Sequence, residues 1–187
     1  MKSKTLIIYL TGKPGVGKYT IAKELAGNGE FIICDNQLIN NPIFELLGYD
    51  GFSKIPEMAW DSIRHIRTEI FNFLTKFTQK SYILTNNLYE DEGDRNLYEQ
   101  VKKMTELRGS IFVPVKLVIN EQEHLRRVTQ TDRKNRLKTI DPQCAYDKTP
   151  LLSYTHHNLL ELDISNLKPE EVACSIMEHV EKINFEK

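Results

Sequence analysis

Short apolar runs alternate with amphipathic segments along the chain. The runs cover residues 5–10, 31–34, 81–85, 111–119 and 159–164. Runs of this length, rich in β-branched residues, are typical of strands buried on both faces of a parallel sheet. Between the runs, apolar residues recur at three- and four-residue steps, the spacing of amphipathic helices.

This alternation predicts an α/β fold of three layers, a five-stranded parallel sheet with helices on both faces. Parallel strands need crossover connections, and these are right-handed in nearly all proteins. We expect one domain over residues 1–187. Within it, we expect a substrate-side flap and helix at residues 38–80 and a lid at residues 121–150.

The connection after the first strand is glycine-rich, with the sequence Gly12-Lys13-Pro14-Gly15-Val16-Gly17-Lys18-Tyr19-Thr20. It follows the G-x-x-x-x-G-K pattern of phosphate-binding loops and lies between an apolar strand and an amphipathic helix. Glycines let successive N–H groups converge on a phosphate, while the lysine adds a charge for the terminal phosphates. We therefore expect residues 12–20, called the phosphate loop below, to bind ATP.

One position departs from the strict pattern. Ser or Thr usually follows the lysine and binds magnesium through its hydroxyl, but Tyr19 stands there in this chain. Thr20 comes next, and the resulting G-K-x-T resembles adenylate kinases, which have a glycine at the place of Tyr19. The phosphate cradle is thus predicted, and how the chain holds Mg²⁺ stays open.

The second strand ends at Asp35, followed two residues later by Gln37. Polar side chains at the carboxyl end of a parallel strand face the crevice where ligands of open α/β sheets bind. Asp35 is therefore a candidate catalytic residue, and its alternative role is to cap the next helix. The third strand runs into Asn86, where many phosphate-loop enzymes carry an acid. Glu90 or Asp91 could substitute, but Asp94 fits better as a helix N-cap.

Arginines on two later segments are candidates for binding anions. Arg64 and Arg67 lie with Trp60 on one edge of a helix predicted near residues 57–79, where they could bind a charged substrate or simply face solvent. A basic stretch follows a helix that begins at Asn120; its members are Arg126, Arg127, Arg133, Lys134, Arg136 and Lys138. A solvated helix face is the alternative for this stretch.

Composition narrows the partners. The 25 Lys and Arg balance 26 Asp and Glu, so the chain as a whole has no attraction to nucleic acid or anionic lipid. No apolar run approaches the roughly 18 residues that span a bilayer. Three separated cysteines, Cys34, Cys144 and Cys174, suggest reduced thiols. We expect a soluble cytoplasmic protein without a membrane partner and of unknown oligomeric state.

Together these features resemble nucleoside monophosphate kinases, shikimate kinases and small bacterial kinase-like ATP-binding proteins. The resemblance implies that Lys18 binds the β and γ phosphates of ATP and that Mg²⁺ accompanies the nucleotide. Asp35 matches the first acid of the shikimate kinase D-x-D, where Gln37 replaces the second. Arg67, within Ile66-Arg67-Thr68-Glu69, matches an arginine that binds the substrate carboxylate. Arg133 and Arg136 resemble catalytic lid arginines.

The predicted function is an ATP-dependent kinase of an unidentified small molecule. Lys18, Asp35, Arg133 and Arg136 are its candidate catalytic residues, and Asp35, Gln37, Arg64 and Arg67 its candidate substrate-binding residues. Two alternatives stay open: an ATP-binding regulatory module with little turnover, and a kinase of nucleic acid ends. The G-protein motifs N-K-x-D and D-x-x-G are missing from the chain.

Overall fold

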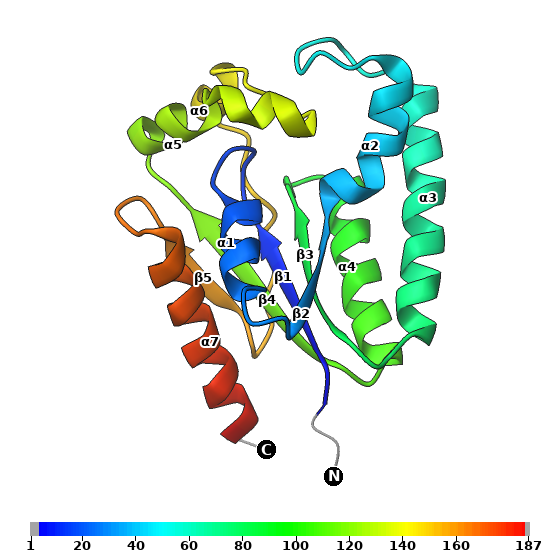
Figure 1. Cartoon of the computed structure of the whole chain (residues 1–187), viewed down its shortest axis with the longest axis vertical. Coiled ribbons are helices and arrows are strands. Elements are labelled where there is room, and N and C mark those ends of the chain that lie inside the picture. Colours follow the sequence, from blue (N-terminus) through cyan, green and yellow to red (C-terminus); the bar gives the residue numbers. More distant parts are fainter. Residues whose placement is uncertain (1–3, 186–187) are drawn as a thin grey trace.

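The computed structural model describes residues 4–185 and contains one parallel sheet with helices on both faces (Figure 1). The strands are β1 (Leu6–Thr11), β2 (Phe31–Asp35), β3 (Ser81–Asn86), β4 (Ile111–Val118) and β5 (Leu160–Asp163). The helices are α1 (Lys18–Leu25), α2 (Asn36–Leu47), α3 (Glu57–Lys76), α4 (Glu92–Leu107), α5 (Glu121–Val128), the 3₁₀ helix η1 (Thr131–Arg136), α6 (Gln143–Tyr146) and α7 (Pro169–Phe185).

The strand order is β2-β3-β1-β4-β5, and every pairing is parallel. This confirms the predicted fold class. β1 lies at the centre, where Ile7 pairs with Tyr82 of β3 and Phe112 of β4. A strand that is hydrogen-bonded on both sides and covered on both faces explains the continuous apolar runs of the sequence.

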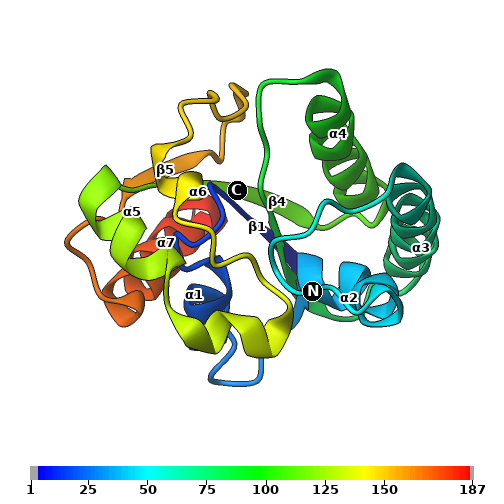
Figure 2. The same ribbon diagram turned by 90° about the horizontal axis from the view of Figure 1, so that it is seen from above.

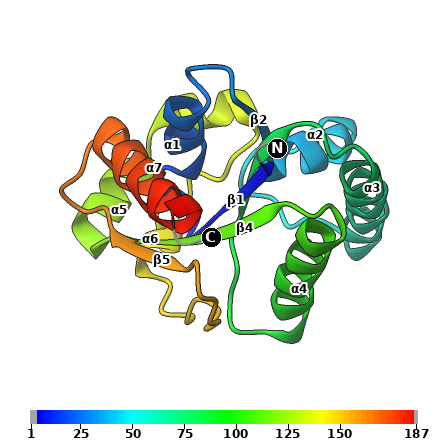
Figure 3. The same ribbon diagram turned by 90° about the horizontal axis from the view of Figure 1, so that it is seen from below.

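Alternate residues of β1 feed two separate apolar layers. Ile8 and Leu10 pack with α1 and α7, while Ile7 and Tyr9 pack with α3 and α4. Figure 3 shows the two helix layers on opposite sides of the sheet. All four of these side chains are fully buried. The sheet is therefore a rigid support that holds the carboxyl ends of its strands at one edge.

The start of the predicted flap is a helix, since α2 begins directly after Asp35 and continues through Pro42 to Leu47. One local prediction is corrected. The N-cap of α4 is Asp91, whose carboxylate accepts a hydrogen bond from the backbone N–H of Asp94. Asp94 lies inside the first turn instead and accepts from the backbone N–H of Tyr89.

The lid (residues 121–150) contains α5, η1 and α6 and crosses the carboxyl edge of the sheet above the phosphate loop (Figures 1 and 2). Its first helix begins as predicted. Asn120 is the N-cap, and its side chain accepts a hydrogen bond from the backbone N–H of Glu123 at 2.9 Å. The lid thus faces the edge where the sequence places its candidate site.

Candidate active site

A cavity of about 830 Å³ lies between the lid and the carboxyl edge of the sheet. Its lining includes the phosphate loop, α1, the end of β3, the connection between β5 and α7, α2 and the start of α3. Ligands of open parallel sheets bind at this edge, so the cavity lies where proteins of this fold class bind their ligands.

The phosphate loop has the backbone that its sequence predicts. Gly12, Gly15 and Gly17 have φ angles of +146°, +90° and +107°. A Cβ on Gly12 would lie 2.6 Å from the carbonyl oxygen of Leu117, and one on Gly15 would lie 2.8 Å from Cβ of Val128. Gly17 is the N-cap of α1 and provides no side-chain cap. The first-turn N–H groups of α1 can therefore bind an anion.

Lys18 holds its ammonium group inside this loop. Its Nζ donates hydrogen bonds to the carbonyl oxygens of Gly12 at 2.6 Å and Lys13 at 2.9 Å. It also donates to Oδ1 of Asn87, just beyond β3, at 2.7 Å. The lysine is therefore bound by an amide one residue beyond Asn86, the position where many phosphate-loop enzymes carry an acid.

Positive charge accumulates around Lys18. Burial lowers the pKa of Lys18 well below its usual value, and the nearby charges of Lys138 and Arg133 lower it further. Burial also lowers the pKa of Arg133, a lid residue that lines the cavity. Asp35 pairs with Arg136 and Lys138, but Lys18 and Arg133 form no ion pair among the described residues. This excess of half-buried cations favours a polyanionic ligand.

Tyr19 faces the lid. Its ring centroid lies 3.6 Å from the guanidinium carbon of Arg136 and 4.6 Å from Nζ of Lys138. Lys23 of α1 approaches the same ring at 5.6 Å. The residue that departs from the phosphate-loop pattern is therefore a platform for lid cations.

Asp35 caps α2, one of the two roles considered for it, and also pairs with cations of the lid. Its Oδ1 accepts a hydrogen bond from the backbone N–H of Leu38 at 3.1 Å, which caps α2. Its Oδ2 accepts one from Nη2 of Arg136 at 3.0 Å and lies 3.8 Å from Nζ of Lys138. The carboxylate is buried and lines the cavity.

Gln37 and Arg133 also line the cavity, and their polar groups bind lid backbone. The Gln37 side-chain amide donates hydrogen bonds to the carbonyl oxygens of Arg136 at 2.9 Å and Leu137 at 3.0 Å. Nε of Arg133 donates to the carbonyl oxygen of Thr139 at 3.0 Å. The structure thus brings Lys18, Asp35, Gln37, Arg133 and Arg136 together around one cavity.

Two predicted substrate ligands lie outside the cavity lining. Arg64 is exposed and forms ion pairs with Glu57 and Asp61, the solvent-facing alternative of the sequence analysis. Arg67 is partly buried, and its Nε has no hydrogen-bond partner among the described residues. Burial raises the pKa of Tyr9, and the charge of Arg67 opposes this rise. Aromatic residues of α2 and α3 occupy the cavity wall instead, among them Trp60.

Solved structures share this architecture. A candidate kinase from Chloroflexus aurantiacus superposes with a TM-score of 0.69 at 14% identity, over 97% of this chain and 99% of that one. A gluconokinase from Sinorhizobium meliloti gives 0.62 at 12% identity, over 96% and 93% of the two chains. A shikimate kinase from Aquifex aeolicus gives 0.53 at 20% identity, over 96% and 98%.

The chain has the P-loop kinase fold. This confirms the resemblance drawn from the phosphate loop and the order of elements. No family model and no curated protein matches the sequence. Among the described residues, none of the helices combines the length and apolar character that crossing a membrane requires.

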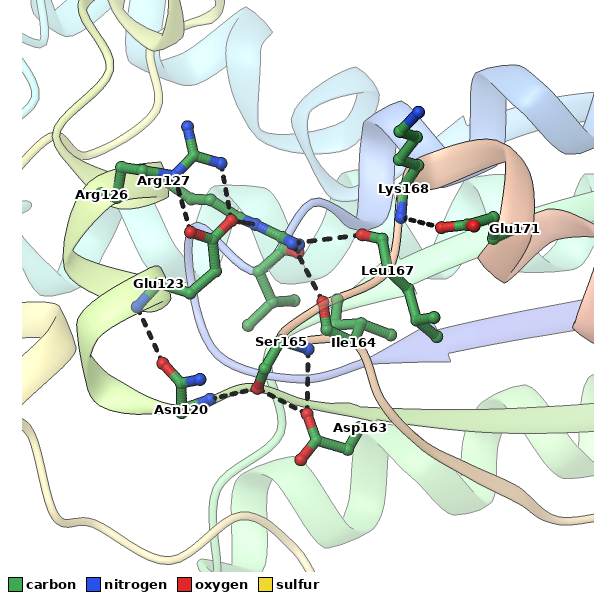
Figure 4. Close-up of polar contacts among 11 residues, drawn as sticks. Asn120, Glu123, Arg126, Arg127, Asp163, Ile164, Ser165, Leu167, Lys168 and Glu171 are labelled. Atoms are coloured by element: carbon green, nitrogen blue, oxygen red, sulfur yellow. Dashed lines mark hydrogen bonds and ion pairs between the residues drawn. The ribbon is translucent and has the colours of Figure 1, made fainter.

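In this P-loop kinase fold, Arg127 joins α5 to the phosphate loop and to the connection between β5 and α7 (Figure 4). Its guanidinium donates to the carbonyl oxygens of Val16 at 2.9 Å and Ile164 at 3.0 Å, and to Glu123 at 2.7 Å. Arg126 binds the same carboxylate but remains largely exposed. Of this pair, Arg127 is therefore the structural arginine.

We expect Arg127→Met to lower the free energy of unfolding by about 2 to 3 kcal/mol, because it leaves buried acceptors without a charged donor. Arg126→Met keeps an equally long stem and should cost about 0.5 kcal/mol or less, as for exposed pairs. Urea denaturation of both variants measures the difference. Equal losses would contradict the structural role of Arg127.

Some site residues escaped sequence reasoning. His124 of α5 is buried, and its Nε2 lies 2.5 Å from the carbonyl oxygen of Pro14. Burial lowers its pKa, so the neutral ring donates from Nε2 at pH 7. A single histidine within a charged helix gives no signal of this role. Asn87 was visible as a polar residue after the third strand, and Lys138 as part of the basic stretch.

Lys138 makes stability depend on pH. Burial lowers its pKa to about 8 against the opposing effect of Asp35, and Arg136 and Arg133 lower it further. An unfolded lysine titrates near about 10.4. Between these values the unfolded chain binds more protons, so the unfolding free energy rises with pH. We expect wild type to gain stability relative to Lys138→Met between pH 7.5 and 9.5 in urea titrations; a constant difference would contradict this.

Proposed function

We propose that this protein is an ATP-dependent kinase that transfers the γ-phosphoryl group to a hydroxyl of a small molecule. The observation that carries the proposal is the group of mutually repelling cations, Lys18, Arg133 and Lys138, beside an uncapped helix N-terminus in one cavity. A triphosphate chain would neutralise these charges and accept hydrogen bonds from the loop. The gluconokinase and shikimate kinase of the same fold support this class of reaction.

The chain's own residues would place and stabilise the transferring group. Phosphoryl transfer needs in-line positioning and positive charge around the equatorial oxygens more than covalent chemistry. Lys18 would bind the β and γ phosphates from the loop side, with Arg133 and Arg136 on the lid side. Asp35 would orient the acceptor hydroxyl, because a carboxylate has lone pairs beyond those that accept from Leu38 and Arg136. The lid would keep water from the phosphoryl group.

Mg²⁺ would neutralise charge on the phosphate oxygens. Within residues 4–185, no group of three or more His, Cys, Asp or Glu could hold a metal ion. A nucleotide-bound Mg²⁺ usually needs only one or two protein oxygens, since phosphates and water complete its shell. Thr20, Asn86 and Asn87 line the cavity and have such oxygens. These residues fit a metal brought in with ATP.

The side of the cavity formed by α2, α3 and the loop between them combines carboxamides with aromatic rings. Its lining includes Asn36, Gln37, Asn40, Phe44, Tyr49 and Trp60. We take this side as the acceptor site. Asn40 is buried, and its Oδ1 has no partner among the described residues. Carboxamides both donate to and accept from hydroxyl groups, while aromatic faces pack on rings. We therefore propose a ring compound with several hydroxyl groups, such as a sugar or nucleoside, as the acceptor.

An ADP-release assay with Mg-ATP tests the proposal. The acceptors are sugars, sugar acids, nucleosides and nucleoside monophosphates, each neutral compound paired with its anionic analogue. We expect strong stimulation by one neutral member. Stimulation only by anionic members would refute the acceptor class but not the kinase, and titration calorimetry without ATP binding would refute both.

The regulatory module remains the second candidate, favoured by Tyr19 and by the amide Asn86 at the end of β3. Tight ATP binding with uniform background turnover would support it. The lid weighs against a nucleic acid groove, because Arg136 and Lys138 contact Asp35 and Tyr19 inside the molecule. Arg127 is likewise bound to the phosphate loop.

A further inference from the structure

Two positions where the chain departs from related kinase motifs contact the same lid segment. Tyr19 stands where the phosphate-loop pattern has Ser or Thr, and Gln37 stands where the shikimate kinase pattern has its second Asp. Arg136 lies over the Tyr19 ring, and its carbonyl oxygen accepts a hydrogen bond from Gln37. The two departures therefore meet at one point of the lid.

We propose that Tyr19 and Gln37 form a latch that holds the lid over the phosphate loop, and that Tyr19 is a positioning residue for Arg136. The effect of the latch on catalysis rests on the proposed kinase function, whereas the existence of the latch does not. An exchange of Ser or Thr for Tyr replaces a metal-binding hydroxyl with a broad aromatic face. In this protein that face positions a cation that the lid carries.

Different residues hold the side chain of Arg136 and the backbone next to it. The guanidinium of Arg136 is placed by the Tyr19 ring at 3.6 Å and by Asp35 at 3.0 Å, so it has one aromatic and one ionic partner. The neighbouring backbone is bound by Gln37, which reaches two successive carbonyl oxygens. Lys138 adds a second cation over the ring at 4.6 Å.

The backbone held by Gln37 is itself strained. Leu137 has a φ of +52°, the one positive φ among the described non-glycine residues. A left-handed conformation is unfavourable for a residue with a branched side chain and persists only where surrounding contacts impose it. Gln37 is buried and is not a surface residue. Both hydrogen bonds that its side chain donates go to this turn. Release of the latch would let this strained turn relax and the lid move.

Limited trypsin digestion without any ligand tests the latch, since the segment contains Arg133, Lys134, Arg136 and Lys138. Cation–π attraction predicts that Tyr19→Leu, which has no aromatic face, is cut in this segment about fivefold faster than wild type. Tyr19→Phe keeps the face and should be cut at the wild-type rate. Mass spectrometry assigns the sites, and cutting at exposed Lys103 of α4 reports global unfolding and should stay constant.

A further variant tests the other half of the latch. Gln37→Leu removes both backbone hydrogen bonds and should also accelerate cutting in the lid. Equal lid cutting in Tyr19→Leu and Tyr19→Phe would overturn the positioning role of the ring, and no effect of Gln37→Leu would overturn the latch.

A kinetic readout links the latch to turnover. With the acceptor found in the ADP-release assay, Tyr19→Phe should keep the wild-type kcat, whereas Tyr19→Leu should lower kcat more than it raises the KM for ATP. A protein that binds no ATP but shows the predicted digestion pattern would refute the proposed function and leave the latch. If the Tyr19 variants were digested like wild type but had an altered kcat, the latch would be refuted and the proposed function would stand.

Discussion

Lys18→Ala should reduce kcat by at least about a hundredfold, the effect of removing one preorganised donor from a charged transition state. The same change should weaken ATP binding in titration calorimetry. Lys18 is half-buried within the phosphate loop, and its pKa is lowered by burial and by facing cations. Lys138 and Arg133 belong to the lid, and Lys13, the other cation of the loop, donates to the carbonyl oxygen of Asp147. None of them replaces the charge that Lys18 places inside the loop.

A matched lysine provides the control for this prediction. Lys103 is exposed on α4, on the far side of the sheet from α1, and Lys103→Ala should leave both turnover and ATP affinity unchanged. Circular dichroism should show that both variants keep their helix content. Tight ATP binding by Lys18→Ala would mean that the nucleotide does not occupy the phosphate loop.

The fold could be predicted because its signals are local. Apolar runs such as residues 81–85 specify strands, and glycine placement around Lys18 specifies the loop, so each element depends on a few neighbouring residues. The structure moves no strand end by more than one residue. The first part of the flap was assigned no helix or strand of its own, whereas the structure has α2 there, beginning at the Asp35 cap.

The pairing of the site residues could not be predicted from local signals. Asp35 and Arg136 are separated by 101 positions, and only the path of the lid across the sheet brings them together. From the sequence, Tyr19 was interpreted only as lacking a hydroxyl on Cβ. In the structure its aromatic ring contacts cations of the lid. Arg67 matched a family motif, yet Trp60 lines the cavity wall and Arg67 does not.

The second prediction with a large effect concerns Asp35, whose two roles can be separated by two substitutions. Asp35→Asn keeps an oxygen that can accept from the backbone N–H of Leu38, since Asn caps helices as well as Asp does. It removes the charge that faces Arg136 and would orient the acceptor hydroxyl. We expect kcat to fall by about 10² to 10⁴, the usual contribution of a positioned acid or base, with ATP affinity nearly unchanged.

Asp35→Ala removes the cap as well as the charge. It should therefore be less stable than Asp35→Asn by about 1 kcal/mol in urea denaturation, the usual cost of a lost N-cap. Its loss of turnover should equal that of Asp35→Asn, because the charge and not the cap acts on the acceptor. If Asp35→Asn kept wild-type turnover while Asp35→Ala lost stability, Asp35 would be a helix cap alone, and the acceptor hydroxyl would need another partner among the amides that line the cavity.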